Sequence, residues 1–413
     1  MAKLFMVLVC AMVAWSTIEV SSSKTSRGLR ELRSSSIKSP VVIVPGTGGS
    51  QLEAKLNKPS TLHWYCHKTS STFFTLWLQK SSLLPWAIDC WVDNMRLVYD
   101  KATNTVHNAP GVETRVPGFG QTNTIEYLDT NNLIKYFKPM VEALVSWGYQ
   151  RGISVRAAPY DFRYAPDSAN DYFTKLRGLI EETYKANGNK QVTLLSHSLG
   201  CPYTLVFLNK QTNEWKNTYI KQWITLSGIW GGSAQLLRLY ASGDSFGVPI
   251  ANPLTVRGEQ RSCTSNNYML PSDELWSADE VLLKTSTRSY TVKDYDAFFK
   301  DIGYPEGSFI RRNVQGLTSP LAQHSPNVTL YCLHGSGVDT PESYTYAKGD
   351  FPDGTPSVIN SDGDGTVNER SLKACGNFRQ MPKITVKDYA GVNHNGILSS
   401  DPAHSFIKSV LFQ

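Results

Sequence analysis

The feature that most constrains the fold is a buried strand that turns at once into a helix. Residues 191–195, with the sequence QVTLL, predict a strand, and residues 203–208 have the composition of a helix. Between them lies the sequence SHSLG at 196–200. A serine exposed on so sharp a turn needs small residues two positions to either side, which is the pattern of a nucleophile elbow. The usual pattern begins with Gly, and Ser196 is a small residue that can replace it. The elbow therefore makes Ser198 the predicted nucleophile.

The rest of the chain alternates strands with helices. An alternation of this kind predicts a mostly parallel sheet with helices on both faces, and together with the elbow it predicts an α/β-hydrolase fold. Residues 52–100 and 233–312 interrupt this alternation of strands and helices. We expect these two segments to be insertions into one domain spanning residues 40–413. The predicted strands are 41–44, 153–155, 222–226, 328–333 and 384–389, and the predicted helices are 132–147 and 171–185.

A serine hydroxyl is an effective nucleophile only when a neighbouring base takes its proton. In a chain with such an elbow, the acid and then the histidine follow the serine. His394 lies in a loop after the last predicted strand, where the base is expected, whereas His334 directly follows a strand and is more simply a structural histidine. Asp362 and Asp364 share a glycine-rich turn, and either could orient the imidazole. On the residues alone, the acid stays open between these two.

The oxyanion of an acyl-transfer intermediate needs two preorganised N–H donors. We expect one from the backbone of Leu199, directly after the nucleophile, and the other from the backbone of Thr47, in the glycine loop that ends the first strand. Metal chemistry is not indicated, because His63 and His67 lack a third ligand and the acidic turn lacks the remaining oxygen ligands of a calcium loop. We predict no metal and no cofactor.

The N-terminus has the layout of a secretory signal peptide. Lys3 precedes an apolar run at residues 4–15 that is too short to span a bilayer, and small residues follow. We assign residues 1–23 to the signal peptide and the polar residues 24–39 to a disordered lead-in, with an uncleaved anchor as the alternative. No later segment has the length of a transmembrane helix, so we expect a soluble protein of the secretory pathway, either lysosomal or secreted.

This compartment permits disulfides and glycosylation. Asn327 is in the single Asn-x-Ser/Thr acceptor of the chain. The cysteines left after signal removal allow about 15 complete pairings, so the sequence leaves their connectivity open. These cysteines are Cys66, Cys90, Cys201, Cys263, Cys332 and Cys375.

The distribution of charged and apolar residues indicates whether the protein binds nucleic acid or lipid. The net charge of +6 is spread along the chain without a Lys/Arg run, which argues against nucleic acid and leaves a weak attraction to anionic lipid. Residues 73–78 and 83–88 are strongly apolar. They are either a core-facing insertion, the simpler reading of the composition, or a flap that presents Trp and Leu to a membrane. Residues 233–269 could form a mobile lid.

A set of motifs then resembles the lecithin:cholesterol acyltransferase family, and its lysosomal phospholipase A2 branch in particular. The likeness extends from about residue 40 to the C-terminus. The motifs are VPG at 44–46, GSQLEAK at 49–55, DCW at 89–91, RVPGFG at 115–120, APYDFR at 158–163, SHSLG at 196–200, WGG at 230–232 and GDGTV at 363–367.

The resemblance implies a phospholipase A and lipid O-acyltransferase with an α/β-hydrolase core, a membrane-binding insertion and a lid. It implies an acyl-enzyme formed from a glycerophospholipid, with water, ceramide or sterol as acceptor, and a monomer acting at a phospholipid membrane or lipoprotein surface. A dedicated phospholipid:sterol acyltransferase and a non-catalytic lipid-binding protein are the alternatives. The implied sites are the triad Ser198, Asp364 and His394, the oxyanion hole at Thr47 and Leu199, the disulfides Cys66–Cys90 and Cys332–Cys375, and the membrane-binding residues Trp77, Leu78, Leu84 and Trp86.

Three positions depart from the family pattern. The lysosomal enzymes carry an acidic residue at position 47, so Thr47 argues against a strictly acidic pH optimum. Phe162 replaces the usual Trp of the Tyr-Asp-Trp-Arg motif. Cys201-Pro202 directly after the elbow is unusual, although Pro is tolerated in the first turn of a helix.

Overall fold

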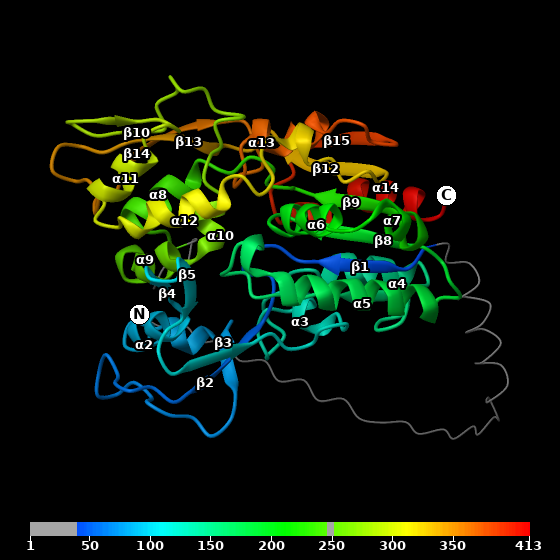
Figure 1. Cartoon of the computed structure of the whole chain (residues 1–413), viewed down its shortest axis with the longest axis horizontal. Coiled ribbons are helices and arrows are strands. Elements are labelled where there is room, and N and C mark those ends of the chain that lie inside the picture. Colours follow the sequence, from blue (N-terminus) through cyan, green and yellow to red (C-terminus); the bar gives the residue numbers. More distant parts are fainter. Residues whose placement is uncertain (1–38, 246–251) are drawn as a thin grey trace, which may run out of the picture. The chain divides into compact units, whose positions relative to one another are not determined.

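The computed structural model describes residues 39–245 and 252–413, so the predicted signal peptide and the lead-in up to residue 38 lie outside it. In these ranges six parallel strands form the central sheet, in the order β15-β12-β9-β8-β1-β7 (Figure 1). The predicted parallel sheet is thus confirmed. Its strands are β1 (Val41–Val44), β7 (Val155–Ala157), β8 (Val192–His197), β9 (Ile220–Leu226), β12 (Leu330–Ser336) and β15 (Ile384–Ala390).

Helices cover both faces of this sheet. Successive side chains of a strand point to opposite sides, and in these strands the side chains on both sides are largely apolar, so both faces must be covered. In β1, Val42 and Val44 pack into one apolar layer, and Val41 and Ile43 pack into the other. The first layer is closed by helices α5 (Asn170–Ala186), α6 (Gly200–Asn209) and α7 (Asn213–Tyr219). The second is closed by α4 (Lys138–Ser146) and α14 (Asp401–Leu411).

Several predicted elements have different bounds in the structure. The strand expected at 328–333, for example, is β12 at 330–336, and two of the shifts have a clear local cause. The helix expected at 132–147 begins only at Lys138, because Lys135 pairs with Tyr127 in a β-bridge and Asn132 has a φ of 58°. The apolar spacing before that point belongs to a short extended segment. The strand expected at 153–155 lies at 155–157 instead, since residues 152–154 form a turn.

Residues 52–100, which we predict to be an insertion, pair among themselves and with the segment that follows. A three-stranded sheet has the order β3-β2-β6, and β4 pairs with β5. The elements are β2 (Leu52–Leu56), β3 (Phe74–Trp77), α2 (Ile88–Met95), β4 (Leu97–Asp100), β5 (Thr105–Asn108) and β6 (Val112–Arg115).

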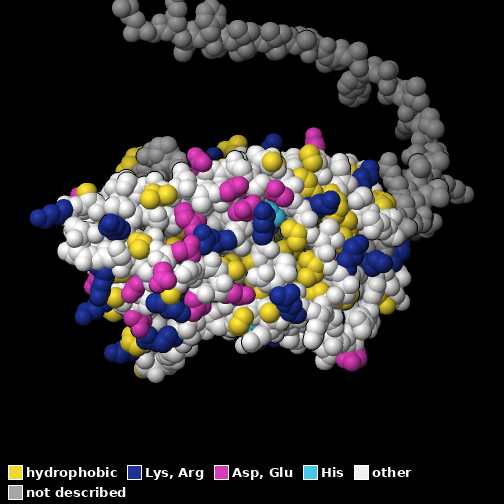
Figure 2. All heavy atoms as spheres, turned by 90° about the horizontal axis from the view of Figure 1, so that it is seen from above, with side chains coloured by type: hydrophobic (Ala, Val, Ile, Leu, Met, Phe, Trp, Pro, Cys, Tyr) yellow, Lys and Arg dark blue, Asp and Glu magenta, His cyan; other side chains and the backbone are white. Residues whose placement is uncertain are grey.

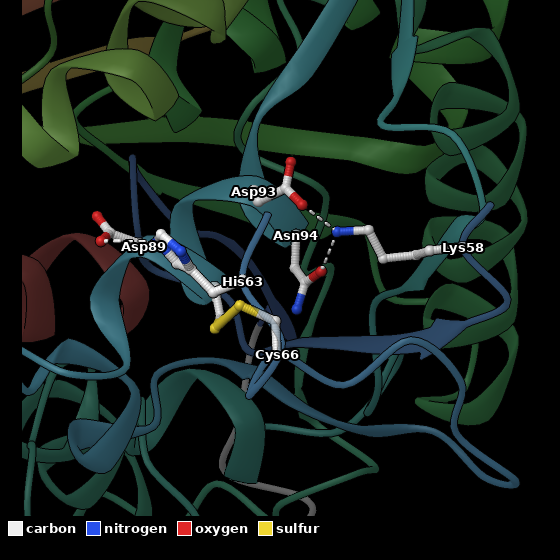
Figure 3. The surroundings of a disulfide bond; sticks show 7 residues. Lys58, His63, Cys66, Asp89, Asp93 and Asn94 are labelled. Atoms are coloured by element: carbon white, nitrogen blue, oxygen red, sulfur yellow. Dashed lines mark hydrogen bonds and ion pairs between the residues drawn. A yellow bond between two sulfur atoms is a disulfide. The ribbon is translucent and has the colours of Figure 1, made fainter. Parts of the chain in front are cut away.

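A disulfide between Cys66 and Cys90 joins the long loop of this insertion to α2, the pairing that the resemblance implies (Figure 3). The base of the same loop is held by Lys58, which is buried and whose ammonium contacts Asp93 and, at 2.9 Å, the Oδ1 of Asn94. A buried cation therefore fixes the start of the loop, and a covalent bond its middle, to one helix.

The second predicted insertion, 233–312, is mainly helical and shares a small sheet with residues 340–361. This four-stranded sheet has the order β11-β10-β13-β14. Strands β13 and β14 were not predicted; they pair antiparallel with each other, and the pairing of β10 with β13 joins them to the insertion. The elements are α8 (Gln235–Ser242), α9 (Pro253–Ser262), α10 (Thr264–Tyr268), β10 (Leu283–Lys284), β11 (Ser289–Tyr290), α11 (Tyr295–Asp301), α12 (Glu306–Val314), β13 (Thr340–Thr345) and β14 (Ser357–Ser361).

The surface carries both signs of charge. On the face shown in Figure 2, the described Lys and Arg side chains lie scattered among Asp and Glu side chains and apolar groups. In the described ranges, no helix combines the length and the apolar character needed to cross a membrane.

Candidate active site

Ser198 lies between β8 and α6 with a φ of 54°, a conformation that a side-chain-bearing residue rarely adopts. Its N–H donates to the carbonyl of Leu226 on the neighbouring strand, 3.0 Å away. Gly200 is required here, because a Cβ at this position would lie 2.3 Å from the carbonyl oxygen of Pro45. The strained turn and the close approach of the β1 loop are the features of a nucleophile elbow.

Ser196 replaces the usual glycine because the structure has partners for its hydroxyl. The Oγ accepts a hydrogen bond from the indole N–H of Trp223 at 2.8 Å and donates to the sulfur of Cys201 at 3.3 Å. Burial raises the pKa of the Cys201 thiol to about 12, so this cysteine stays protonated. Cys201 and Cys263 are both buried and unpaired, whereas Cys332 bonds to Cys375 as the resemblance implies.

Three residues far apart in the sequence meet at the carboxyl ends of the strands. The Oγ of Ser198 lies 2.9 Å from the Nε2 of His394, and the Nδ1 of His394 lies 2.7 Å from the Oδ2 of Asp364. Asp364 is fully buried, and Ser198 and His394 are each 8% exposed. The His394 N–H also donates to the carbonyl of Asp364 at 2.8 Å, so the two loops are joined by backbone as well as side chain.

The histidine contacts Asp364 rather than Asp362. Burial alone would raise the pKa of the Asp364 carboxyl, but the ring of His394 and the N–H groups of Val367 and Thr366 hold it below its usual range. Its Oδ1 accepts from these two N–H groups at 2.8 and 3.1 Å. Asp362 is exposed, and its carboxylate accepts from the N–H of Gly337 at 2.6 Å.

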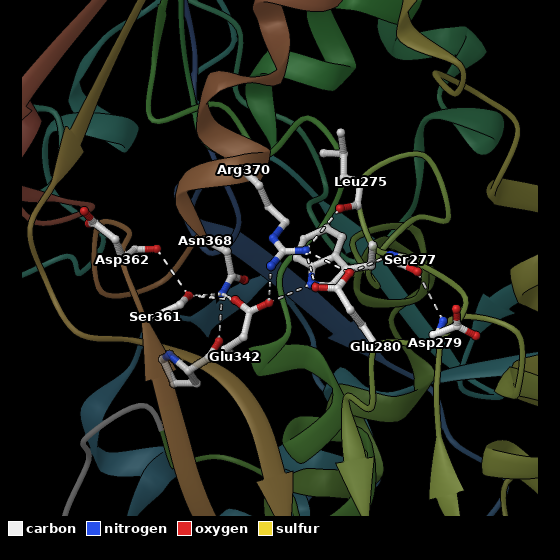
Figure 4. Close-up of polar contacts among 11 residues, drawn as sticks. Leu275, Ser277, Asp279, Glu280, Glu342, Ser361, Asp362, Asn368 and Arg370 are labelled. Atoms are coloured by element: carbon white, nitrogen blue, oxygen red, sulfur yellow. Dashed lines mark hydrogen bonds and ion pairs between the residues drawn. The ribbon is translucent and has the colours of Figure 1, made fainter.

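A polar network that the sequence did not indicate supports the Asp364 loop (Figure 4). Glu342, on β13, accepts hydrogen bonds from the Nδ2 of Asn368 at 2.7 Å and from the indole of Trp276 at 3.0 Å, and Arg370 forms an ion pair with it at 3.0 Å. The Oδ1 of Asn368 accepts from the N–H of Ala234, 3.1 Å away. The loop that carries the acid is thereby tied to Ala234 in the second insertion and to β13, which in turn contacts Trp276 of that insertion.

The two predicted oxyanion donors lie on the loop after β1 and on the elbow. Within the described part of the chain, neither the N–H of Thr47 nor that of Leu199 donates to an acceptor. Leu199 is buried, whereas Thr47 is exposed and its hydroxyl lies 3.7 Å from the sulfur of Met269. Two unused N–H groups on the loops that flank the serine could bind an oxyanion.

Trp77 makes contacts within the protein. This side chain is half-buried, its indole N–H donates to the carbonyl of Gly48 at 2.8 Å, and its ring packs near Trp91 and Phe162. Trp77 therefore supports the loop after β1. The sequence did not indicate this contact, because an aromatic residue in an apolar run suits either a core or a surface setting.

The exposed aromatic residues of the first insertion lie elsewhere. Trp64 is 94% exposed and Trp86 is 68% exposed, whereas Leu78 and Leu84 are half-buried. These two Trp residues border a groove of about 920 Å³ whose lining is mostly apolar. Trp64 was missed because it lies outside the two apolar runs of the sequence.

The remaining candidates lie apart from the serine. His334 is buried within β12, which continues to Ser336, and lies 3.8 Å from the carboxylate of Asp388. Asn327 is exposed, as a glycan acceptor must be. Among the described residues, no group of His, Cys, Asp and Glu is arranged to hold a metal ion.

Known proteins are similar to this chain in sequence, in fold, or in both. The family described as lecithin:cholesterol acyltransferase matches residues 73–309 and 311–404. The lysosomal phospholipase A and acyltransferase of Rattus norvegicus is 45% identical over 378 residues, covering 91% of this chain and 90% of that protein. The phosphatidylcholine-sterol acyltransferase of Mus musculus is 41% identical over 375 residues, covering 90% and 85%. A chain in the crystal structure of the Tle4–Tli4 complex shares the fold with a TM-score of 0.55 at 12% identity, covering 91% of this chain and 97% of that one.

Proposed function

The chain belongs to the lecithin:cholesterol acyltransferase family, and on that premise we propose that it is a phospholipase A and lipid O-acyltransferase acting through Ser198. The observation that carries the proposal is the hydrogen-bonded series Ser198, His394 and Asp364 beside two unused N–H groups. The substrate class is a glycerophospholipid. We place the protein in the secretory pathway, lysosomal or secreted, as a monomer with a glycan on Asn327.

In the acylation step, the Nε2 of His394 takes the proton of Ser198 as Oγ bonds to the carbonyl carbon of a phospholipid ester. The negative charge that forms on the carbonyl oxygen is held by the N–H groups of Thr47 and Leu199. The C–O bond to the glycerol backbone then breaks, and His394 returns its proton to that oxygen. A lysophospholipid leaves, and the acyl group stays on Ser198.

In the deacylation step, the same base activates the acceptor. His394 takes a proton from water or from the hydroxyl of a lipid alcohol such as ceramide, whose oxygen attacks the acyl carbonyl. The bond to Oγ breaks and Ser198 regains its proton. Water yields a fatty acid, whereas the alcohol yields an acylated lipid.

The acceptor is tested by product analysis on vesicles that contain a phospholipid, ceramide and a sterol, at pH 4.5 and 7.5. We expect lysophospholipid together with fatty acid and acylated ceramide. Predominant steryl ester would instead identify a dedicated phospholipid:sterol acyltransferase. Failure of a fluorophosphonate probe to label Ser198 in the folded protein would favour a non-catalytic lipid-binding protein.

We propose that the first insertion binds the surface of a phospholipid membrane or lipoprotein through Trp64 and Trp86. Their exposure supports this, because amphipathic aromatic side chains are favoured at a lipid interface. Replacing both with Ser is expected to weaken binding to phospholipid vesicles by about tenfold or more, since each removes apolar area that would enter the interface. Vesicle sedimentation measures the change.

The control uses a short-chain ester in solution, on which the double variant should keep its activity. The matched variant Trp77→Ser should instead lose activity on both substrates, because Trp77 supports the Gly48 loop. Equal losses on vesicles and on the soluble ester in the Trp64 and Trp86 variant would indicate a folding role and contradict the membrane assignment.

A charge introduced at position 47 is expected to change how the activity depends on pH. An Asp has a pKa of about 3.9 when unperturbed, so the carboxyl introduced by Thr47→Asp is roughly half ionised at pH 4 and almost fully ionised at pH 7.5. Beside the developing oxyanion this charge is repulsive, and the activity of Thr47→Asp should therefore fall as the pH rises. We expect kcat/KM relative to wild type to be about tenfold lower at pH 7.5 than at pH 4.

The comparison is the pH profile of Thr47→Asn, which has a similar size and no charge. Its ratio to wild type should be constant across the same range. A Thr47→Asp profile parallel to that of wild type would mean that position 47 lies too far from the oxyanion to influence it.

A further inference from the structure

A second series of hydrogen bonds runs behind the proposed catalytic residues. The N–H of Gly46 lies 2.9 Å from the hydroxyl of Tyr136, and that hydroxyl lies 2.7 Å from the Nδ1 of His197. The Nε2 of His197 lies 3.0 Å from the carbonyl oxygen of His394. The series therefore joins the loop after β1 to the loop of the proposed base, and it passes through the residue that precedes Ser198.

The direction of each hydrogen bond follows from the chemistry of its two ends. The carbonyl of His394 can only accept, so the Nε2 of His197 carries the hydrogen. A neutral imidazole then has a bare Nδ1, which accepts the hydroxyl hydrogen of Tyr136. The oxygen of Tyr136 is left to accept from the N–H of Gly46, which can only donate. Every donor has one acceptor, and no position requires a second proton.

Burial keeps the series in this one protonation state. Desolvation, with a smaller effect of the neighbouring His394, lowers the pKa of His197 to about 3. Burial raises the pKa of the Tyr136 phenol well above its usual range. The rings of His197 and His394 are only 4.8 Å apart, and a cation on His197 would oppose the imidazolium that His394 forms during the reaction.

The loop after β1 has little freedom at this point. A Cβ on Gly46 would lie 2.7 Å from the Cβ of Ser198 and 3.1 Å from the hydroxyl of Tyr136. The backbone of the loop is thus in direct contact with the elbow and with the phenol. A shift of Gly46 would carry with it the N–H of Thr47, the next residue.

We propose that Tyr136 and His197 are positioning residues that hold the oxyanion loop and the catalytic histidine in register around Ser198. This inference rests on the proposed function, in which Thr47 is an oxyanion donor and His394 is the base. Neither side chain touches the substrate in this account. They act through the backbone of Gly46 and of His394.

The test is Tyr136→Phe, which removes the shared hydroxyl and leaves both the N–H of Gly46 and the Nδ1 of His197 without a partner. We expect kcat on a soluble short-chain ester to fall by about 10- to 100-fold with KM nearly unchanged, because misplacing a catalytic group by about 1 Å costs up to about 100-fold. Binding of a boronic acid, which forms a tetrahedral adduct on the serine, should weaken by a similar factor.

The matched control is Tyr149→Phe. Tyr149 is also buried, packs in the same apolar layer, and donates one hydrogen bond to the carbonyl of Ser39 at 2.9 Å, at the opposite end of β1. This variant should lose comparable thermal stability while keeping kcat and boronate affinity. The comparison separates the positioning role from the general loss of a buried hydrogen bond.

A second pair of variants tests His197, and replaces the first if Tyr136→Phe does not fold. His197→Gln keeps an N–H that can reach the His394 carbonyl, whereas His197→Phe keeps ring size without a hydrogen bond. We expect the Gln variant to recover part of the kcat that the Phe variant loses.

Equal kcat in Tyr136→Phe and Tyr149→Phe, or equal kcat in the two His197 variants, would overturn the proposal. So would a loss that lies wholly in KM with boronate affinity intact. Such results would leave the proposed function standing if Ser198→Ala is inactive, whereas an active Ser198→Ala would overturn the proposed function itself.

Discussion

Replacing Ser198 with Ala is expected to lower kcat on phospholipid vesicles by about a million-fold, while the protein stays folded. The reason is that the Oγ is the atom that bonds to the acyl group, and no other hydroxyl contacts the Nε2 of His394 among the described residues. Release of lysophospholipid, followed by mass spectrometry, measures the change. Circular dichroism establishes that the fold is kept.

Ser196→Gly is the control for this prediction. It restores the usual first residue of the elbow and removes a hydroxyl that accepts from Trp223. The buried indole N–H loses its partner, so we expect a stability loss of about 1–3 kcal/mol but retained activity. If Ser196→Gly were as inactive as Ser198→Ala, the loss in both would come from damage to the elbow. An active, folded Ser198→Ala would remove the serine from the mechanism.

Asp364→Asn is expected to lower kcat by about ten thousand-fold with little effect on folding. The Asn oxygen can still accept from the N–H groups of Thr366 and Val367, so the loop keeps its shape. Its amide N–H₂ then faces the Nδ1 of His394 and donates to it. That nitrogen must accept, the hydrogen moves to Nε2, and His394 can no longer take the proton of Ser198.

Asp362→Asn makes the same change two residues earlier. Its carboxylate is exposed and accepts from the N–H of Gly337, away from His394. This variant should therefore keep near wild-type kcat in the same vesicle assay. A larger loss in Asp362→Asn than in Asp364→Asn would exchange the roles of the two acids.

The central sheet and the elbow were predictable because their signals are local. The β-branched run at 41–44 must be buried on both faces, and the structure has β1 at these residues. The small residues around Ser198 leave only a sharp turn between strand and helix. Chain order then restricted the histidine to the last loop, where His394 contacts the serine. The choice of Asp364 required the family resemblance, since Asp362 has the same local surroundings in the sequence.

The supporting contacts were not predictable because they join residues that are distant in the sequence. Tyr136 is 90 residues from Gly46 and 61 from His197, and nothing in the local pattern distinguishes it from a core tyrosine. The same holds for Glu342 and Asn368, which hold the acid loop, and for Trp77, whose partner Gly48 is 29 residues away. The hydrogen-bond partners and the burial of such side chains are determined by the tertiary fold, and the local sequence pattern does not reveal them.

The acyl-enzyme on Ser198 is the species that distinguishes this mechanism most directly. The protein is mixed with phospholipid vesicles, quenched in acid within the first turnover, and digested, and the peptide that contains residue 198 is weighed by mass spectrometry. We predict that this peptide carries the mass of one acyl chain, that lysophospholipid is released in step with it, and that ceramide speeds its loss with formation of acylated ceramide. Release of lysophospholipid without any acylated Ser198 peptide, under conditions that trap acyl-serine in a known serine lipase, would contradict the account.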